Sequence, residues 1–337
     1  MAVTIKDIAK LANVSITTVS RVINNKSDGV SQKTRENILR IVKELNYQPN
    51  RLAQSLVTKK TNTLGLVLPD ITNPFFPEIV RAIEDTANNF GYNLILCNTD
   101  DNNKKESLYL QVLKEKCVDG IIFTSSINPK SQNIKQLMEY KIPFVLLDRY
   151  IDMEEQLPGV YTDGILGMYQ AVKYFIEMGH KKIAFISGPK ESKTAKQRYL
   201  GYIKALAEYN LPIRDFLIKE GNYKVSGGQK AMMELLTSKE DFTAVLCAND
   251  LMAIGAMEVL KQKNIKIPEE ISIAGFDNIS LSNVVDPKLT TVAQPYYEMG
   301  RSATKMLIKL IEGKSLRKKE VILKPRLIIR NSVAKRG

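Results

Sequence analysis

Residues 3–24 read VTIKDIAKLANVSITTVSRVIN, and their spacing predicts two short helices joined by a tight turn. Thr4 and Asp7 stand three residues apart, which is the spacing of a capping box at the start of a first helix. Ser15 is the expected cap of a second helix, after a turn at 12–14. Two short helices in this arrangement are typical of a unit that lays one helix into the major groove of DNA.

The second helix is predicted to have one buried face and one free face. Its apolar side chains recur at the spacing of a buried helical stripe: Val19, Val22 and Ile23. The opposite face carries the side chains that we expect to meet base edges and phosphates: Ile16, Thr17, Ser20 and Arg21. A third helix is expected after Ser31, with a buried stripe of Ile38, Ile41, Val42 and Leu45. A small three-helix bundle with a solvated basic face is the alternative interpretation.

The net charge of +13 is concentrated at the two ends of the chain. Residues 1–62 contain 11 Lys and Arg against 4 Asp and Glu, as expected of a module that binds phosphates. Residues 314–337 contain 9 against 1, which we interpret as a solvated surface strand and a short tail. No apolar run approaches the roughly 20 residues that span a membrane, and the first residues lack the apolar core of a signal peptide. We therefore expect a cytoplasmic protein with no membrane partner.

The residues after the third predicted helix, NYQPN at 46–50, are expected to end it at Pro49. Residues 51–56, RLAQSL, have room for about two turns of helix. A helix this short is marginal alone, so we expect it to form only when another partner supports it. Leu52 and Leu56 are open to a second interpretation, as core residues against the following domain.

From Thr63 the pattern changes to an alternation of buried strands and helices. Continuous apolar runs predict strands that are covered on both faces, at 64–68, 94–97, 120–123, 144–147, 183–186, 244–247 and 271–274. The helical segments between them indicate parallel sheets with helices on both faces. About 275 residues are too many for one such sheet, so two similar lobes are expected.

Polar and aromatic side chains gather after the predicted strands, where the ligand of an open α/β sheet lies. They are Asn73, Phe75, Phe76, Asp148, Arg149, Arg198, Asn249, Asp277 and Gln294. Aromatic faces stack on the C–H surfaces of a sugar, while carboxylates, amides and guanidinium groups bond to its hydroxyls. Taken singly, these residues have other interpretations: a helix-start core for Phe75 and Phe76, a structural ion pair for Asp148 and Arg149, and a helix cap for Asp277 or the neighbouring Asp250.

The sequence contains little that would support catalysis. Its one histidine, His180, stands in a Met-Gly-His-Lys turn without a serine or cysteine motif that would make it a triad base. Residues 313–315, GKS, lack the upstream glycine of a phosphate loop, and no dinucleotide fingerprint follows the first strand. The three cysteines, Cys97, Cys117 and Cys247, fit no metal site and are expected to be buried reduced thiols. We therefore expect no catalytic residue, no metal and no cofactor.

The helix-turn-helix, the NYxPN segment, the short helix ending at Leu56 and the strand after it resemble the LacI/GalR family of transcription regulators. The resemblance runs from Val3 to about Ser332. It implies an N-terminal all-α helix-turn-helix headpiece with a hinge helix, followed by two doubly wound parallel α/β lobes of the periplasmic-binding-protein type I, joined by three crossovers near 161–162, 291–292 and 323–324. The implied domain boundaries are 1–48 for the DNA-binding domain, 49–60 for the hinge, 61–161 with 292–322 for the N-terminal lobe, and 162–291 with 323–337 for the C-terminal lobe.

The resemblance also assigns roles in DNA binding. The matching positions are Thr4, Ser15, Ile16, Thr17, Ser20, Arg21, Asn24, Asn50, Ala53 and Leu56. Leu56 matches the hinge leucine that wedges into the minor groove and kinks the operator. Ile16 departs from members that carry a polar or aromatic side chain there, which favours an apolar contact such as a thymine methyl group.

The nine residues after the strands match, position by position, the sugar contacts of ribose-binding proteins of this superfamily. The resemblance therefore implies a ribose-like aldose as the effector, with a sugar acid or a hexose next. It implies a transcriptional regulator, expected to be a repressor, of a sugar-utilisation operon, acting as a homodimer on a pseudo-palindromic operator in double-stranded DNA. The alternatives are a carbon catabolite regulator with a phosphorylated carrier protein as corepressor, and a sugar-binding protein that does not bind DNA.

Overall fold

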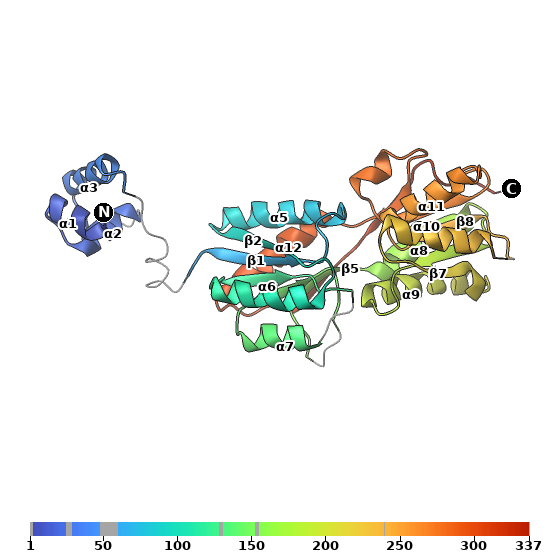
Figure 1. The fold of residues 1–337 in the computed structure, drawn as a ribbon, viewed down its shortest axis with the longest axis horizontal. Coiled ribbons are helices and arrows are strands. Elements are labelled where there is room, and N and C mark those ends of the chain that lie inside the picture. Colours follow the sequence, from blue (N-terminus) through green and yellow to red (C-terminus); the bar gives the residue numbers. More distant parts are fainter. Residues whose placement is uncertain are drawn as a thin grey trace. The chain divides into compact units, whose positions relative to one another are not determined.

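The computed structural model describes residues 3–24, 29–47, 60–127, 131–151, 155–238 and 240–336. The chain divides into two compact units, Met1–Thr61 and Asn62–Gly337 (Figure 1). No helix of the described residues is both long and apolar enough to cross a lipid bilayer. The described helices of the N-terminal unit are α1 (Ile5–Ala12), α2 (Ile16–Ile23) and α3 (Gln32–Glu44).

Local capping interactions begin these three helices. The Asp7 carboxylate accepts hydrogen bonds from the backbone N–H of Thr4 at 2.8 Å and from its hydroxyl at 2.7 Å. The Ser15 hydroxyl oxygen accepts the Thr18 N–H at 3.1 Å, and Ser31 caps α3 in the same way. These bonds satisfy N–H groups that a helix start leaves without partners. The predicted helix-turn-helix is confirmed.

The interior of the N-terminal unit is small. Its buried residues are Ile8, Ala9, Val19, Val22, Ile38 and Ile41. Ile23, Val42 and Leu45, which the stripe pattern places inside, are only partly buried at its edge, because three short helices cover little of one another. The expected hinge helix, with Asn50, Ala53 and Leu56, lies outside the described residues.

The second unit contains two sheets, each covered by helices on both faces. The strands of the first sheet run parallel in the order β11-β5-β4-β3-β1-β2. They are β1 (Thr63–Leu68), β2 (Asn93–Asn98), β3 (Gly120–Phe123), β4 (Phe144–Leu147), β5 (Gly159–Thr162) and β11 (Glu320–Leu323). Helices α5 (Phe75–Asn89) and α12 (Tyr296–Ile311) pack together on one face, and α6 (Asn103–Glu115) and α7 (Ser131–Glu139) on the other (Figure 1).

The second sheet repeats this plan with one exception. Its strand order is β12-β10-β9-β8-β6-β7, and only the edge strand β12 runs antiparallel to its neighbour. The strands are β6 (Ile183–Ser187), β7 (Ile218–Glu220), β8 (Ala244–Cys247), β9 (Ser272–Asp277), β10 (Thr290–Ala293) and β12 (Arg326–Ile328). The helices are α8 (Gly164–Glu177) with α9 (Lys193–Glu208) on one face, and α10 (Val225–Leu236) with α11 (Asp250–Gln262) on the other. Two 3-10 turns, η1 (Asp215–Leu217) and η2 (Ser280–Asn283), complete the lobe.

The chain passes three times between the two sheets. The passages follow β5, β10 and β11, which end at Thr162, Ala293 and Leu323. The crossovers predicted near 161–162, 291–292 and 323–324 lie within two residues of these strand ends. The α/β fold class with two parallel-sheet lobes is confirmed, and all seven strands predicted from apolar runs are present.

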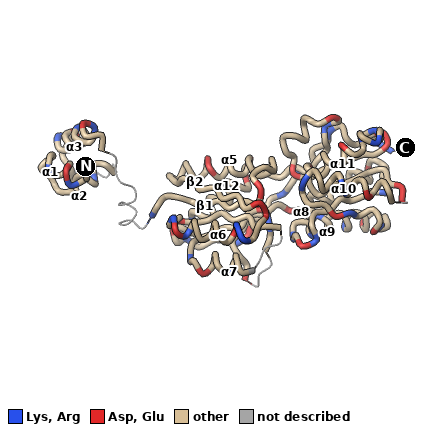
Figure 2. Tube along the Cα trace, in the orientation of Figure 1, with Lys and Arg blue, Asp and Glu red and all other residues tan. Residues whose placement is uncertain are grey.

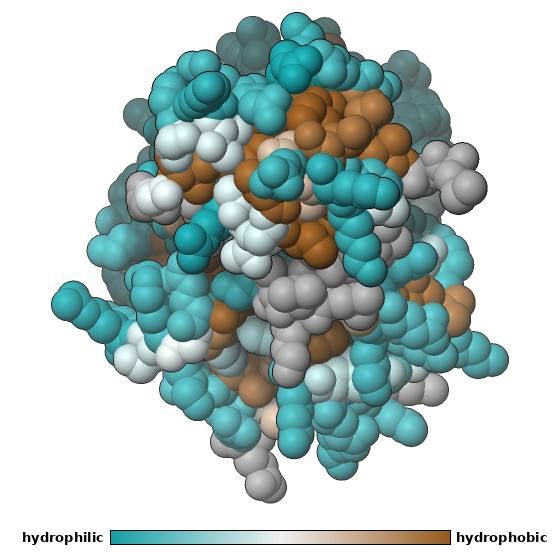
Figure 3. Space-filling view, turned by 90° about the vertical axis from the view of Figure 1, so that its left-hand side faces the viewer, coloured by the Kyte–Doolittle hydropathy of each residue, from teal (hydrophilic) through white to brown (hydrophobic). Residues whose placement is uncertain are grey.

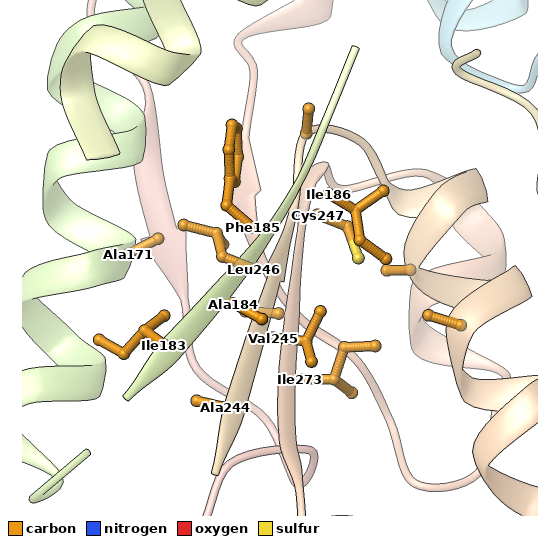
Figure 4. Close-up of a cluster of buried hydrophobic side chains, with 14 of the residues drawn as sticks. Ala171, Ile183, Ala184, Phe185, Ile186, Ala244, Val245, Leu246, Cys247 and Ile273 are labelled. Carbon is orange, nitrogen blue, oxygen red and sulfur yellow. The ribbon is translucent and has the colours of Figure 1, made fainter. Parts of the chain in front are cut away.

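The strands of the second lobe show why continuous apolar runs predicted buried strands correctly. Residues of β6 and β8 point to both faces of the sheet and are almost fully buried (Figure 4). Figure 4 labels Ala171, Ile183, Ala184, Phe185, Ile186, Ala244, Val245, Leu246, Cys247 and Ile273. A strand buried on both faces has no polar side to alternate with, so its sequence is continuously apolar.

The cysteine prediction is right for two of the three thiols. Cys97 and Cys247 are buried, and burial raises the pKa of the Cys97 thiol to about 11. Cys117, by contrast, is exposed, in a left-handed turn with φ of 53° that follows α6. None of the three forms a disulfide within the described residues.

The buried side chain of His180 connects the C-terminal segment to the second lobe by hydrogen bonds. Its Nε2–H donates to the Ala334 carbonyl at 3.0 Å, which leaves Nδ1 to accept the Thr243 hydroxyl at 2.9 Å. Burial lowers the pKa of the imidazole. The Met-Gly-His-Lys turn therefore contributes to structure, in agreement with the absence of a triad motif.

We expect protonation of His180 to loosen the C-terminal segment. A folded-state pKa below the unfolded value of 6.5 means that this residue's stabilising effect is complete above pH 6.5 and is lost as the pH falls below it. Amide hydrogen exchange at Ala334 and Arg336 should accelerate between pH 7 and pH 5 beyond its intrinsic pH dependence. The variant His180→Gln should remove that pH dependence, and an identical pH response in both proteins would contradict this assignment.

Candidate functional site

All nine residues predicted to contact a ligand line one cavity between the two sheets of the second unit. They are Asn73, Phe75, Phe76, Asp148, Arg149, Arg198, Asn249, Asp277 and Gln294, and Thr194 and Tyr223 join them. The first five come from the first lobe and the others from the second lobe or the passage after β10. The carboxyl ends of the strands thus meet across the cavity, as the open-sheet rule predicts.

The aromatic wall belongs to the start of α5. The Asn73 carboxamide oxygen accepts the Phe75 N–H at 3.1 Å, which fixes the turn before the helix. The rings of Phe75 and Phe76 meet edge to face with centroids 4.9 Å apart, and Tyr296 lies edge-on to Phe75 at 5.4 Å. Both phenylalanines belong to the buried core of the first lobe as well as to the cavity wall, so their two interpretations are compatible.

Arg149 is paired with a carboxylate other than its sequence neighbour. Its Nη1 donates to Asp101 at 2.6 Å and to the Ser125 carbonyl at 2.8 Å. The adjacent Asp148 is half-buried, and burial raises the pKa of its carboxyl while Arg198 and Arg149 oppose that rise. A structural ion pair between Asp148 and Arg149 is therefore not the arrangement found.

Arg198 is the central cation of the second lobe. It lies on α9 with only 6% of its side chain exposed. Its Nη1 donates to the Ala248 carbonyl at 2.6 Å, and its Nη2 is 3.5 Å from Asp277. The guanidinium carbon is 4.0 Å from the centre of the Phe276 ring. Packing and hydrogen bonds together hold the guanidinium plane in one orientation.

Asp277 and Asn249 occupy strand ends in the second lobe. The Asp277 carboxylate accepts the Gln294 amide at 2.7 Å, yet burial raises the pKa of its carboxyl to about 7 despite the opposing effects of Arg198 and Gln294. Asn249 caps α11 by accepting the Met252 N–H at 3.0 Å, so neither Asp250 nor Asp277 is the helix cap that the sequence left open.

Three of the buried polar atoms around this cavity have no hydrogen-bond partner within the described chain. They are Nε of Arg198, Oε1 of Gln294 and Oγ1 of Thr194. The first can only donate and the second can only accept, while the threonine hydroxyl can do both. Because leaving such atoms buried and unbonded is costly, they indicate a ligand with neighbouring donors and acceptors.

The backbone of the cavity wall is strained at three side chains. Asp148, Tyr223 and Asp277 have φ angles of 65°, 62° and 114°. Residues with a side chain seldom adopt such angles, and they persist only where the surrounding structure fixes them. Strain of this kind concentrates at functional sites, which agrees with the position of all three around the cavity.

Thr194 and Tyr223 are cavity residues that the sequence analysis missed. Thr194 stands four residues before Arg198 on α9, so helical spacing places both on one face and would have identified it. Tyr223 follows β7, an edge strand of three residues without an apolar run. Because that strand gave no sequence signal, the loop after it could not be recognised as a strand end.

The N-terminal unit presents a different surface. Basic residues lie on α1, α2 and α3 (Figure 2). The face of the chain shown in Figure 3 is largely hydrophilic, with some hydrophobic areas. On α2, Ile16, Thr17 and Arg21 are exposed, with 44% of Ile16 open to solvent.

Four other predicted DNA contacts take part in local hydrogen bonds. Thr4 and Ser15 belong to the helix caps described above, and Asn24 donates to the Ser20 carbonyl at 2.8 Å. Ser20 is accordingly half-buried. Ile16, Thr17 and Arg21 are thus the side chains of α2 most accessible to a partner.

Two family models match the chain. Residues 4–50 match the bacterial regulatory proteins of the lacI family, and residues 61–331 match the periplasmic binding proteins and sugar binding domain of the LacI family. The chain belongs to the LacI family. It is a transcriptional regulator of sugar metabolism, and members of this family are DNA-binding regulators rather than enzymes. No cluster of metal-binding side chains occurs among the described residues.

Relatives of this LacI-family chain cover nearly its whole length. It is 40% identical to the ribose operon repressor of Halalkalibacterium halodurans over 98% of this chain and 96% of that protein. It is 39% identical to catabolite control protein A of Priestia megaterium over 98% and 99%. Among solved structures, a lac repressor dimer bound to operator and an anti-inducer has a TM-score of 0.88 and 28% identity, covering 99% of this chain and 100% of that one.

Proposed function

We propose that this regulator represses a sugar-utilisation operon and is controlled by a neutral monosaccharide bound in the cavity between its lobes. The observation that carries the proposal is the set of buried atoms on Arg198, Gln294 and Thr194 that have no partner in the described chain. Adjacent sugar hydroxyls both donate and accept, so one ring can satisfy all three. The aromatic wall of Phe75 and Phe76 supplies a face for the C–H surface.

The charge around the cavity favours a neutral sugar over a sugar acid. Arg149 is engaged by Asp101, and Arg198 by Asp277 and a backbone carbonyl. Asp148 is a further, half-buried carboxylate beside them. A carboxylate ligand would add negative charge to a site whose two cations already have anionic partners, which is costly away from water.

D-Ribose is the first choice among neutral sugars. All nine residues that match the sugar contacts of ribose-binding proteins line the cavity, which supports this choice. The similarity to a protein named as a ribose operon repressor supports the same choice.

Calorimetric titration of the full chain tests the ligand. D-Ribose, other pentoses, D-glucose and a keto-sugar acid should be compared at pH 7.5. We expect ribose or another pentose to give the strongest binding, with hexoses weaker and the acid undetectable. Absence of heat with ribose would reject ribose, and absence of binding by every neutral sugar would reject the proposed class of effector.

The DNA-binding surface is proposed to be the free face of α2 together with the hinge. Two copies of the chain are required to read the two halves of a pseudo-palindromic operator, so we propose a cytoplasmic homodimer. Exposed apolar side chains on the second lobe, of which Val284 is 75% exposed, offer area for such an interface. Effector and operator affinities must then be coupled reciprocally.

Replacing Arg21 by methionine is expected to weaken operator binding by about tenfold or more, because an exposed recognition-helix arginine contacts bases or phosphates. Gel shifts with a duplex that the protein itself selects from a random library would measure this. Arg40→Met removes the same charge from α3, where Arg40 pairs with Glu44 at 2.9 Å, and should have a much smaller effect. Equal losses in both variants would indicate a purely general charge effect.

A second candidate function follows from the similarity to catabolite control protein A. In that case a phosphorylated carrier protein would strengthen operator binding as a corepressor. Gel shifts with D-ribose alone, with a serine-phosphorylated carrier protein alone and with both distinguish the two functions. Operator affinity that changes only with the carrier protein would favour the second candidate over the first.

A further inference from the structure

Asp250 is a fully buried carboxylate that does not line the cavity. It is the first residue of α11, directly after the cavity residue Asn249. Its Oδ1 accepts the hydroxyl of Thr291 on β10 at 2.5 Å, and its Oδ2 accepts the N–H of Ile279 at 2.9 Å, just after β9. One side chain therefore connects a helix start, a strand and a turn.

Each of these three segments carries a cavity residue. Asn249 precedes the helix start, Asp277 ends β9, and Gln294 follows β10. The part of the cavity wall formed by these residues thus converges on a single buried carboxylate. Arg198, on α9, is held separately by the Ala248 carbonyl.

The turn that Asp250 holds is the strained one. Asp277 has a φ of 114° and Asn278 a φ of 66°, so two consecutive side-chain-bearing residues adopt angles that favour glycine. The Asn278 N–H donates to the Thr291 hydroxyl oxygen at 3.3 Å, and that hydroxyl donates to Asp250. The N–H groups of the two residues after Asp277 therefore donate to Thr291 and to Asp250. These hydrogen bonds explain why the strained turn persists.

The backbone of β9 passes close to the Asp250 carboxylate. A Cβ atom at Gly275 would lie 2.1 Å from its Oδ1, so β9 must carry a glycine where the carboxylate passes. Burying a carboxyl group here, close to the charge of Asp277, is unfavourable for stability. A group kept at such a cost is expected to contribute to something other than stability.

We propose that Asp250 is a positioning residue of the effector site, which fixes the 277–279 turn so that the Asp277 carboxylate faces the ligand. The inference rests on the proposed function of the cavity as the effector site. Asp250 touches no ligand in this arrangement and acts through Asp277. Its loss should therefore reduce effector affinity by the same route as the loss of Asp277.

Two substitutions test the connection. Asp250→Asn keeps only one of the two acceptor oxygens, so either the Ile279 N–H or the Thr291 hydroxyl loses its acceptor, and Thr291→Val removes the hydroxyl at nearly constant volume. Both should weaken D-ribose binding by the full chain on the order of tenfold in calorimetry, as expected when a buried hydrogen bond is broken. Thr86→Val is the matched control, because Thr86 is also buried but bonds only within α5, to Ala82. The control should bind D-ribose as the wild type does.

A double-mutant cycle separates positioning from general destabilisation. If Asp250 acts through Asp277, adding Asp250→Asn to Asp277→Ala should cost less than about twofold further. Adding it to Asn73→Ala, a change in the first lobe, should cost the same factor as in the wild type. A merely structural role predicts the same loss in every background, so full additivity with Asp277→Ala would overturn the proposal.

A measurement without ligand keeps the proposal testable if D-ribose is not the effector. Amide exchange at Asn278 and Ile279 should become at least tenfold faster in Asp250→Asn and in Thr291→Val, and should not change in Thr86→Val. Unchanged protection of these two amides would overturn the proposal by itself. If exchange accelerates but the wild type binds no sugar, the proposed function fails and the positioning of the turn stands.

Discussion

Replacing Arg198 by methionine should destabilise the second unit by about 3–5 kcal/mol at pH 7.5 and abolish effector binding. The guanidinium lies beside two carboxylates, the half-buried Asp148 and the buried Asp277, and offsets the cost of their desolvation. Without it these carboxylates have no nearby unpaired cation, because Arg149 is bound to Asp101. Denaturant unfolding measures the first effect, and calorimetry measures the second.

The loss of stability in Arg198→Met should shrink on acidification. Burial already raises the pKa of Asp148 and of Asp277, so both protonate readily once the arginine is gone, and the cost at pH 5.5 should be well below that at pH 7.5. Arg214→Met is the matched control, since Arg214 pairs with Glu240 at 3.2 Å at the partly exposed edge of the same lobe. That variant should lose at most about 1 kcal/mol. A loss equal to that of Arg198→Met would show that the cavity carboxylates are not the cause.

Asp277→Asn should make the ligand-free protein more stable while it weakens effector binding at least a hundredfold. A carboxyl with a folded-state pKa of about 7, above its ordinary 3.8, disfavours the folded state above pH 7, and that cost disappears as the pH falls from 7 toward 4. Each pKa unit corresponds to about 1.4 kcal/mol, so the gain at pH 8 should be about 2–4 kcal/mol.

The pH dependence identifies the source of that gain. Thermal unfolding should show the difference between Asp277→Asn and the wild type shrinking from pH 8 to pH 5, because the wild-type carboxyl becomes neutral. Asp241→Asn changes an exposed carboxylate and should leave stability nearly unchanged across the range. A variant that is less stable than the wild type at pH 8 would mean that the ion pair with Arg198 outweighs the desolvation of Asp277.

The results expected for these variants indicate a cavity whose side chains favour effector binding and lower the stability of the ligand-free protein. Strained backbone, buried charge and unbonded polar atoms meet around the same cavity, and each is unfavourable in the absence of a ligand. A regulator whose affinity for an effector depends on such features is expected to gain stability on binding it.

Much of the fold was predictable because buried segments have a simple sequence pattern, which is a continuous run of apolar residues in a strand covered on both faces. β6 and β8 are covered on both faces, so their apolar runs identified them. The helix caps at Ser15 and Ser31 were visible for a similar reason, since a hydroxyl at a helix start has one dominant role. The other five strands were not predicted from apolar runs. Strands β7, β11 and β12 are partly exposed sheet edges, whereas β5 and β10 are buried but include glycine, tyrosine or threonine, so neither forms a continuous apolar run.

The members of the cavity were predictable, but their pairing was not. Strand-end positions and the family resemblance placed Asp148 and Arg149 at the cavity, and adjacency in sequence indicated an ion pair. The structure pairs Arg149 with Asp101 instead, 48 positions away, because a loop after a different strand reaches it. Likewise the role of Asp250 depends on contacts with β9 and β10 that no local pattern encodes.

The three passages between the sheets have a consequence for the order in which this protein can fold during synthesis. The first sheet lacks its edge strand until Leu323 has emerged, and the second lacks β12 until Ile328 has. Domains generally fold as units, the N-terminal one first, as the chain leaves the ribosome. Here neither lobe can be completed before the other is nearly finished, whereas α1 to α3 form a separate unit that depends on neither. A nascent chain should therefore acquire a folded headpiece early and both lobes almost together, once residues up to Ile328 have emerged.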